Sequence, residues 1–238
     1  MQMADKTVVV LGGSSGIGLA IAQAALSEGA KIVITGRSKE RLITAREKLG
    51  GKVRSVALDS ADEAGTSALF GELEQVDHIF VSAATVTLGQ GLASETASLR
   101  PAMDTRFWGS FFAAKYGAAK MPPDGSITLC SGTSALRPRT GASVGSASCA
   151  AVEALARSRA VELAPIRVNT IVPGLVDTPL LDAVLGQQRE AFMTQAAAQL
   201  PVRRVGRPED IAEAALFLMK NGFVTGITLT VDGGRLLV

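Results

Sequence analysis

The residues best placed for chemistry are the glycines and serines of Gly12-Gly13-Ser14-Ser15-Gly16-Ile17-Gly18, which follow a short run of β-branched apolar residues. In such a segment the first glycine allows a tight turn, the next lets the backbone approach a phosphate, and the last permits close helix-strand packing. A helix that begins here presents free N–H groups to a pyrophosphate. A purely structural turn is the alternative. The segment favours a nucleotide site made by Gly12, Ser14, Ser15, Gly16, Ile17 and Gly18.

The segment Thr35-Gly36-Arg37-Ser38 indicates which dinucleotide binds. An NAD site normally places an acidic side chain about 20 residues past the glycines, where it bonds the adenosine ribose hydroxyls. Here Gly36 stands in that place, and Arg37 offers charged donors to a 2′-phosphate, with Ser38 beside it. The alternative is an arginine that is merely solvated at a helix start. We therefore expect NADP(H) rather than NAD(H) as the cofactor.

The composition limits the kind of protein that carries these motifs. A chain of 238 residues with 47% hydrophobic content can form one core, so we expect a single domain over residues 1–238. A formal charge of +2 gives no field for nucleic acid or a membrane surface, and neither is expected as a partner. With no signal peptide or membrane span, the expected location is the cytoplasm. Two cysteines make neither a disulfide framework nor a metal site.

Strand and helix patterns alternate from one end of the chain to the other. Short apolar runs, typical of strands buried on both faces, are expected at 7–11, 31–35, 53–58, 78–82, 126–129, 167–172 and 227–231. Helical patterns fall between most of them. This predicts a three-layer, doubly wound α/β fold of the Rossmann type, with a central, mostly parallel sheet of about seven strands. The polar stretch 131–147 follows a central strand, which favours an active-site loop over disorder.

Several ordered motifs resemble those of the short-chain dehydrogenases/reductases, and the likeness runs from about residue 5 to residue 236. They are the glycine segment, Leu58-Asp59, Ile166-Arg167-Val168-Asn169 with Pro173-Gly174, the run from Gly206 to Ile211, Thr225-Gly226 and Val231-Asp232-Gly233-Gly234. The resemblance implies reduction of a carbonyl or oxidation of an alcohol, usually in dimers or tetramers.

The same resemblance implies further positions that hold the cofactor. Asp59, followed by Ser60, would contact the adenine edge. Pro173, Gly174 and Val176 would shape the nicotinamide pocket, and Thr178 would meet the carboxamide or the phosphates. Ala83 and Ala84, at the end of the fourth strand, complete the expected lining.

The resemblance fails where the chemistry should be. Matching the segment from Ala150 to Leu155 puts Gly145 at the family's catalytic tyrosine and Cys149 at its lysine. A glycine has no proton to give, and a neutral thiol cannot replace an ammonium. The only tyrosine, Tyr116, is better explained as a packing residue.

Two polar residues remain as catalytic candidates. The resemblance places Ser131 at the family's serine, where it would bond a substrate oxygen, and Arg106 at the family's asparagine on the central helix. We expect the Arg106 guanidinium to enter the emptied site as an electrostatic stabiliser, because arginine stays charged. The alternative is that Arg106 points to solvent or pairs with a carboxylate such as Asp104.

Two functions follow from these residues. The first is an NADP(H)-dependent oxidoreductase with a non-standard proton source, acting on a small substrate under an apolar loop at about 178–200. Ordinary amphipathic helix packing would explain that loop equally well. The second is a catalytically inactive NADP(H)-binding sensor or partner subunit. Long helices at 96–120 and 147–164, with small-residue faces, predict a homo-oligomer, either a tetramer or a dimer.

Overall fold

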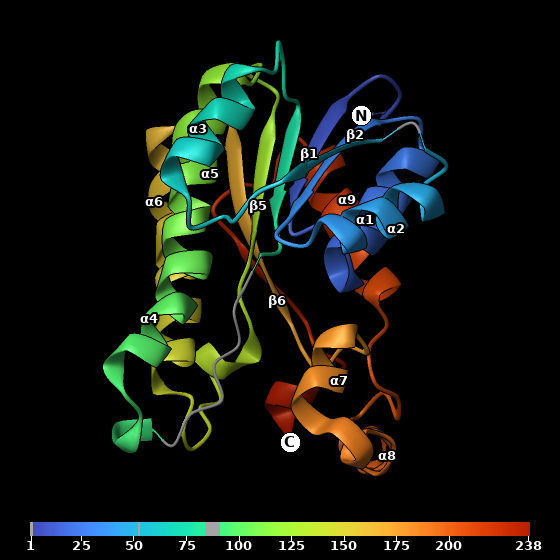
Figure 1. Ribbon diagram of the computed structural model, residues 1–238, viewed down its shortest axis with the longest axis vertical. Helices are drawn as coiled ribbons and strands as arrows, with labels where there is room; N and C mark the ends of the chain where they lie inside the picture. The colour runs from blue at the N-terminus through green and yellow to red at the C-terminus, as the bar shows by residue number, and fades with distance from the viewer. Residues whose placement is uncertain (1, 52, 84–90) are drawn as a thin grey trace.

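The centre of the molecule is a sheet of seven parallel strands. The computed structural model describes residues 2–51, 53–83 and 91–238. The strands lie in the order β3-β2-β1-β4-β5-β6-β7, and every neighbouring pair is parallel (Figure 1). Their bounds are β1 Thr7–Leu11, β2 Lys31–Gly36, β3 Arg54–Ala57, β4 His78–Val81, β5 Ser126–Cys130, β6 Arg167–Pro173 and β7 Thr228–Val231.

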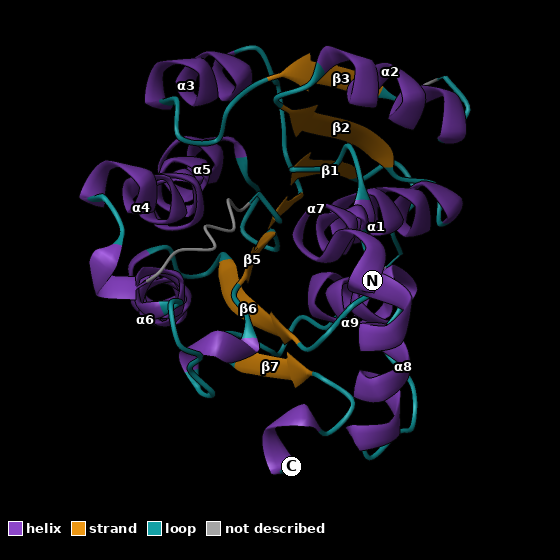
Figure 2. Ribbon diagram, turned by 60° about the horizontal axis from the view of Figure 1, so that its bottom comes forward, coloured by secondary structure: helices purple, strands orange, loops and turns teal. Residues whose placement is uncertain are grey.

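Helices cover both faces of this sheet, which gives three layers (Figure 2). Helices α1, α2 and α9 pack on one face, and α3, α5 and α6 pack on the other. The bounds are α1 Gly16–Ser27, α2 Lys39–Lys48, α3 Glu63–Gly71, α4 Thr96–Met103, α5 Gly109–Gly117, α6 Ser143–Glu162, α7 Pro179–Leu185, α8 Arg189–Gln199 and α9 Pro208–Lys220. No helix in the described part of the chain is long and apolar enough to cross a membrane.

The strands are apolar on both faces because each face contributes to a separate core. In β1 the side chains of Val8 and Val10 join the core under α1 and α9, whereas Val9 and Leu11 join the core under α5 and α6. Alternate side chains of a strand point to opposite faces, so one continuous apolar run serves both layers. The fold class expected from the sequence is confirmed.

The parallel strands bring their following loops to one edge of the sheet. These are the glycine segment after β1, Arg37 after β2, Asp59 after β3 and the segments after β5 and β6. Ligands of open α/β sheets bind at the carboxyl ends of the strands. In Figure 1, α7 and α8 lie below this same edge.

Three segments differ from their expected form. The long helix expected at 96–120 is interrupted by a π-helical segment, Asp104–Trp108, between α4 and α5. Helix α6 begins at Ser143, so the last part of the polar stretch 131–147 is helical and Gly145 lies in the first turn. The expected loop at 178–200 consists mainly of α7 and α8.

The only histidine of the chain lies at the other end of the strands, where they begin. His78 begins β4, is buried, and has its Nδ1 2.9 Å from the Ser126 Oγ. Burial lowers the pKa of His78 from 6.5 to about 4; the neighbouring Asp77 opposes this shift and Arg167 adds to it. The folded protein therefore holds this imidazole neutral at pH values where the unfolded chain protonates it.

We expect the His78 imidazole to make stability depend on pH. Its depressed pKa means that its contribution is fully present above about pH 6.5 and is lost as the pH falls towards 4. The full loss is about 3 kcal/mol, from a shift of roughly two pKa units or more. Urea unfolding at pH 7 and pH 4.5 should show a smaller drop in the unfolding free energy for His78→Gln than for the unmodified protein. Equal drops in both proteins would contradict this assignment.

Candidate functional site

The glycine segment folds into a loop whose shape depends on two of its glycines. Gly12 has a φ of +86°, and a Cβ there would lie 2.7 Å from the Ala83 nitrogen, because the loop packs on the end of β4. A Cβ on Gly18 would lie 2.3 Å from the Gly12 carbonyl oxygen. Side chains at these positions would force the loop away from the sheet. The backbone of the loop therefore stays close to the place where a ligand would lie.

The start of α1 completes this loop. The helix begins at Gly16, and the side chain of its cap residue, Ser15, accepts no capping hydrogen bond. The first N–H groups of the helix are thus available to an anion. The Thr178 side chain lies 3.2 Å from the place of a Cβ on Gly16, so the cap of α7 meets the cap of α1. Two distant candidate residues are brought together here.

Arg37 lies at the end of β2 beside the glycine loop. It is exposed and forms no salt bridge with any described residue. A Cβ on Gly36 would lie 2.8 Å from the Ser14 Oγ, so a larger side chain at the place of the usual acid would displace the Ser14 hydroxyl. The Ser38 hydroxyl donates to Glu40 at 2.7 Å and accepts from the Arg41 nitrogen at 3.2 Å. Arg37 therefore stands without a charged partner among the described residues, and the Ser38 side chain caps α2.

A groove of about 490 Å³ lies next to Arg37. It is lined by Arg37, Val56, Ala57, Leu58, Asp59, Asp62, Gly65, Ala68, Leu69 and Glu72. The Asp59 Oδ1 accepts a hydrogen bond from the Ala61 nitrogen at 3.0 Å, which turns the chain at the end of β3. This groove and the glycine loop lie at the same edge of the sheet, on either side of Arg37.

Some expected cofactor residues have other roles in the structure. Ser60 is buried, and its hydroxyl donates to the Thr105 carbonyl oxygen at 3.3 Å, so it supports the π-helical segment. A Cβ on Gly174 would lie 2.6 Å from the Asp232 Cα, and Val176 pairs with Gly206 in a β-bridge. These residues and Pro173 shape the backbone at the end of β6. Ala84 lies outside the described residues.

Space is left where the resemblance predicted the missing tyrosine. A Cβ on Gly145 would meet no atom of the described residues within 4 Å. Cys149 lies one helical turn later in α6 and is 1% exposed. Among the described residues, a Cβ on Gly132 would meet only the Cys149 Sγ, at 3.5 Å. Both glycines thus leave room near Cys149 in the described part of the chain, and this part of the molecule is called the open region below.

Arg106 reaches this region from the π-helical segment. Its Nη1 lies 2.7 Å from the Cys149 Sγ, 3.2 Å from the Ser148 Oγ and 3.4 Å from the Gly145 carbonyl oxygen. It forms no salt bridge with Asp104 or any other described carboxylate. Single π-turns often occur at functional sites because they turn side chains out of the regular helical register. The guanidinium therefore lies where the sequence predicted, and its role stays a prediction.

Ser131 faces away from the open region. Its hydroxyl lies 2.7 Å from Glu153 Oε1 and 3.1 Å from the Cys149 carbonyl oxygen, and the residue is 5% exposed. The hydroxyl thus has partners within the protein, and its expected contact with a substrate oxygen stays a prediction. Both neighbouring residues meet α6: the Ser131 hydroxyl lies at the Cys149 carbonyl oxygen, and a Cβ on Gly132 would lie at the Cys149 sulfur. Gly132 was not singled out from the sequence, where the alternation of side chains along an extended segment was its only signal, and nothing in the sequence pointed to Glu153.

Two further side chains near the site have settled roles. Burial raises the pKa of the Cys130 thiol to about 12, an effect that nearby Arg106 opposes, so this thiol stays protonated at neutral pH. The Tyr116 hydroxyl donates to Glu63 Oε1 at 2.8 Å and so ties α5 to α3. The structure thus agrees with Tyr116 as a packing residue.

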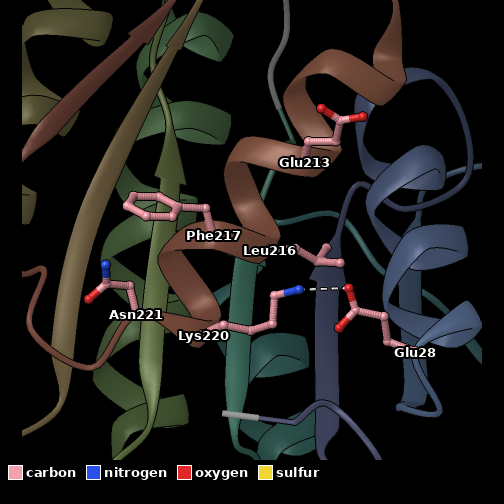
Figure 3. A pocket seen from close by; sticks show the side chains of 6 residues that line it. All are labelled: Glu28, Glu213, Leu216, Phe217, Lys220 and Asn221. Carbon is pink, nitrogen blue, oxygen red and sulfur yellow. Dashed lines mark hydrogen bonds and ion pairs between the residues drawn. The ribbon is translucent and has the colours of Figure 1, made fainter.

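A pocket of about 400 Å³ lies at the other edge of the sheet (Figure 3). It is lined by Glu28, Glu213, Leu216, Phe217, Lys220 and Asn221. The Lys220 Nζ lies 2.7 Å from Glu28 Oε1, which joins the ends of α9 and α1. These helix ends lie beside the starts of the strands, so this pocket is remote from Arg106 and the glycine loop.

Known proteins resemble this chain along nearly its whole length. A family model described as "Enoyl-(Acyl carrier protein) reductase" matches residues 12–235. The chain is 34% identical to an NADP-dependent (R)-specific alcohol dehydrogenase of Lentilactobacillus kefiri, over 98% of this chain and 97% of that protein.

Solved structures are equally similar. A small-chain dehydrogenase in complex with NADPH superposes with a TM-score of 0.86 at 36% identity, over 98% of this chain and 100% of the other. MalC Reductase/Diels-Alderase from Malbranchea aurantiaca superposes with a TM-score of 0.94 at 32% identity, over 100% of this chain and 98% of the other.

Proposed function

Because the chain belongs to the short-chain dehydrogenase/reductase family, we propose that it is an NADP(H)-dependent oxidoreductase with a non-standard proton source. Its substrate is a carbonyl compound or alcohol of small size with an apolar body. The observation that carries this proposal is the Arg106 guanidinium, which occupies the side of the site from which the catalytic tyrosine and lysine are missing.

The cofactor would be held by the edge of the sheet that carries the glycine loop. The start of α1 would bind the pyrophosphate, Arg37 and Ser14 the 2′-phosphate, and the groove at Asp59 the adenine. Thr178 closes over Gly16 from the far side. Bound NADP(H) supplies or accepts the hydride. The substrate that exchanges this hydride would lie in the open region beside Gly145.

Arg106 would act on the substrate oxygen. A fixed guanidinium stabilises negative charge that develops on this oxygen, without giving up its own proton. The proton would come from water that enters the space beside Gly145. Positioning can supply about 7–11 kcal/mol, whereas general acid catalysis contributes about 10²–10⁴-fold, so hydride transfer can survive the loss of the tyrosine. Ser131 would support α6 rather than contact substrate.

The segment 178–200 would cover the substrate. Leu181, Leu185, Phe192 and Met193 are half-buried, and Leu180 is more exposed, so apolar side chains remain accessible along α7 and α8. An apolar lining of this kind suits the body of a hydrophobic substrate. In this proposal residues 1–238 form one domain, and 178–200 covers its substrate site.

A specific observation also favours a second function. Gly132 and Gly145 border the open region without a side chain, so neither can donate a proton to a substrate. A catalytically inactive NADP(H)-binding sensor or partner subunit would need no such donor. One protein of the same fold, MalC Reductase/Diels-Alderase, is named for two different reactions. The fold therefore does not restrict this chain to carbonyl reduction.

An assay of NADPH oxidation, paired with a binding titration, separates the two functions. The panel would contain ketones, aldehydes and imines with apolar bodies. We expect NADPH to bind and at least one member of the panel to be reduced. Binding without turnover across the panel would favour the sensor, and absence of binding would overturn both.

Part of the small-residue face that was expected to join protomers is buried within the protomer itself. Gly109, Ala113 and Ala114 are buried within the protomer, and a Cβ on Gly109 would lie 2.9 Å from the Ser60 side chain. These small residues therefore let α5 approach its own sheet and cannot contact a partner. The part of the small-residue face that remains exposed is Ala147, Ala150 and Ala154 on α6.

An aromatic cluster lies on the outer side of α5. Trp108 is 44% exposed and stacks on Phe112 with ring centroids 5.9 Å apart, while Phe111 lies under the guanidinium of Arg159 from α6. Rings of this size on a surface are typical of protein interfaces. We propose that this cluster and the exposed alanines of α6 form the contact between protomers.

We expect Trp108→Asp combined with Ala150→Glu to reduce the assembly to monomers. Four buried like charges per pair of protomers would oppose contact at this face. Light scattering at micromolar concentration would show the change in mass. The control Ile43→Asp changes an exposed apolar residue on α2 and should keep the oligomer. A monomeric unmodified protein, or an unchanged mass for the double variant, would contradict the proposal.

A further inference from the structure

An exposed surface at the carboxyl-end edge of the sheet combines apolar and cationic side chains. Three segments form it, and we call it the tail surface: the loop 136–139 after β5, the segment 201–203 after α8 and the C-terminal tail 232–238 after β7. Strands β5 and β7 belong to one parallel sheet, so the segments that follow them leave at the same edge as the glycine loop. In Figure 1 the C-terminus lies at the same end of the molecule as α7 and α8.

The three segments are in contact with one another. The Arg137 Nη1 donates a hydrogen bond to the Arg235 carbonyl oxygen at 2.7 Å, which joins the loop to the tail. The Val202 nitrogen donates to the Gly233 carbonyl oxygen at 3.4 Å, and a Cβ on Gly233 would lie 2.7 Å from the Val202 Cγ2. The tail therefore contacts both other segments, and the three make one continuous surface.

Large apolar side chains of the tail surface are in contact with solvent. The exposed fraction is 59% for Leu136, 53% for Val202, 84% for Leu237 and 54% for Val238. None of the four lines either of the two cavities described above. Exposed apolar side chains that gather in one place mark contact with another protein or with a membrane.

The same surface carries positive charge that no acid within it balances. Four of its arginines form no salt bridge with any described carboxylate: Arg137, Arg139, Arg203 and Arg235. Its one acidic side chain is Asp232, whose two carboxylate oxygens accept hydrogen bonds from the Gly234 and Leu236 nitrogens. The terminal carboxylate of Val238 also pairs with none of these arginines.

This positive charge is a local property. The formal charge of the whole chain is +2, which by itself predicts no attraction to a membrane surface. That number is a sum over all faces of the molecule. Salt screens exposed charges beyond about 10 Å at moderate ionic strength, so a partner that touches the tail surface is attracted mainly by the arginines in contact with it.

We propose that the tail surface binds an anionic lipid membrane. Guanidiniums bind phosphate groups through paired hydrogen bonds, and each basic residue close to an anionic surface strengthens binding by roughly fivefold. The apolar side chains enter the boundary between head groups and acyl chains, which adapts to their shape and needs no matching pocket. A partner protein would instead fix its anchor side chains in preformed pockets, and the apolar side chains here line neither described cavity.

Binding in this orientation would bring the carboxyl-end edge of the sheet to the lipid. Helices α7 and α8 lie at the same end of the molecule, and Leu180 of α7 is exposed. An apolar carbonyl compound is concentrated in a bilayer, so it would reach the segment 178–200 directly from the lipid. This consequence rests on the proposed function, whereas the membrane contact itself does not.

Vesicle flotation measures the membrane contact without any turnover. The protein would be mixed with vesicles of phosphatidylcholine alone, or of an equimolar mixture of phosphatidylcholine and phosphatidylglycerol. We expect binding to the mixed vesicles to be tighter by about tenfold or more and to weaken as salt is added. The double variant Arg139→Glu with Arg235→Glu should lose about tenfold or more of this affinity, because two attractions become repulsions.

Matched variants on α2 separate the tail surface from the net charge. Arg41→Glu with Arg46→Glu makes the same change of charge at exposed positions and should bind the mixed vesicles as the unmodified protein does. Leu237→Asn should weaken this binding by roughly threefold or more, because it removes an apolar side chain from the contact. Ile43→Asn, at another exposed apolar position, should not. Thermal unfolding checks that each variant is folded.

Three results would overturn the proposal. One is the absence of binding to the mixed vesicles, and another is equal binding by the unmodified protein and by the variant with Arg139→Glu and Arg235→Glu. The third is complete release from the vesicles by soluble glycerol phosphate at the same total phosphate concentration, which would make this a site for small anions. Light scattering without lipid identifies a different occupant. A lower mass for the arginine variant, with no vesicle binding by the unmodified protein, would make the tail surface a contact between copies of the chain.

Discussion

The double variant Gly145→Tyr with Cys149→Lys is expected to gain no activity towards ketones over the unmodified protein while Arg106 is present. The Arg106 Nη1 lies 2.7 Å from the Cys149 sulfur, so a lysine there would place its ammonium against the guanidinium. Two unit charges about 4 Å apart repel by roughly 4 kcal/mol at an effective dielectric constant of about 20. The lysine would turn away or lose its proton, and in either case it would not assist the tyrosine.

Adding Arg106→Asn and Gly132→Ser to this double variant should then produce activity. Position 132 is chosen because its side chain would face residue 149, whereas the Ser131 hydroxyl is bound to Glu153. We expect kcat/KM for acetophenone to rise by about 10²–10⁴-fold over the double variant, the range of general acid catalysis. Arg106→Asn alone is the control and should gain nothing, because it has no proton donor. Vigorous reduction by the double variant alone would show that Arg106 does not obstruct the site.

The substitution Arg37→Asp is expected to weaken NADPH binding by an order of magnitude or more and to strengthen NADH binding. Arg37 is exposed, has no carboxylate partner among the described residues, and stands beside Gly36 and Ser14 at the end of β2. An attraction for the 2′-phosphate would become a repulsion, while the new carboxylate could bond the ribose hydroxyls of NADH.

Fluorescence titration of both cofactors measures this change. The control Arg46→Asp makes the same change of charge at an exposed position late in α2, so it reports the effect of net charge alone. It should alter NADPH affinity far less, since salt screens charges beyond about 10 Å at moderate ionic strength. Equal affinity of the unmodified protein for NADPH and NADH would contradict the assignment of Arg37.

The sheet was largely predictable because its signals are local. The strand expected at 7–11 is observed with the same bounds, and the others differ by only one or two residues at their ends. A buried parallel strand needs an apolar run that any neighbour can cover, so the run itself identifies it. The π-helical segment Asp104–Trp108 has no such signal, because it depends on how α4 and α5 pack on α6.

The candidate site was predictable only in part. Counting along the chain placed Gly145 and Cys149 at the positions of the family's tyrosine and lysine. The residue type at position 106 identified a cation close to a site that has lost its lysine. The same counting placed Ser131 at a catalytic position, although its hydroxyl is turned to Glu153. Motif spacing specifies which residue stands at a position. It does not specify which of two neighbouring side chains faces the site, because a shift of one residue turns a side chain to the other face.

The sequence by itself determined the fold class, the nucleotide-binding loop and the absence of the tyrosine and lysine, because each depends on residue types at short spacing. Only the tertiary structure decided that Gly132 and Arg106 both lie against the Cys149 sulfur, and that Arg106 pairs with no carboxylate among the described residues. Those relations join the end of β5, the start of α6 and a π-turn that are distant in the chain. Tertiary packing alone sets which atoms of such segments are in contact. The charge of the site and the space within it therefore cannot be read from any one segment.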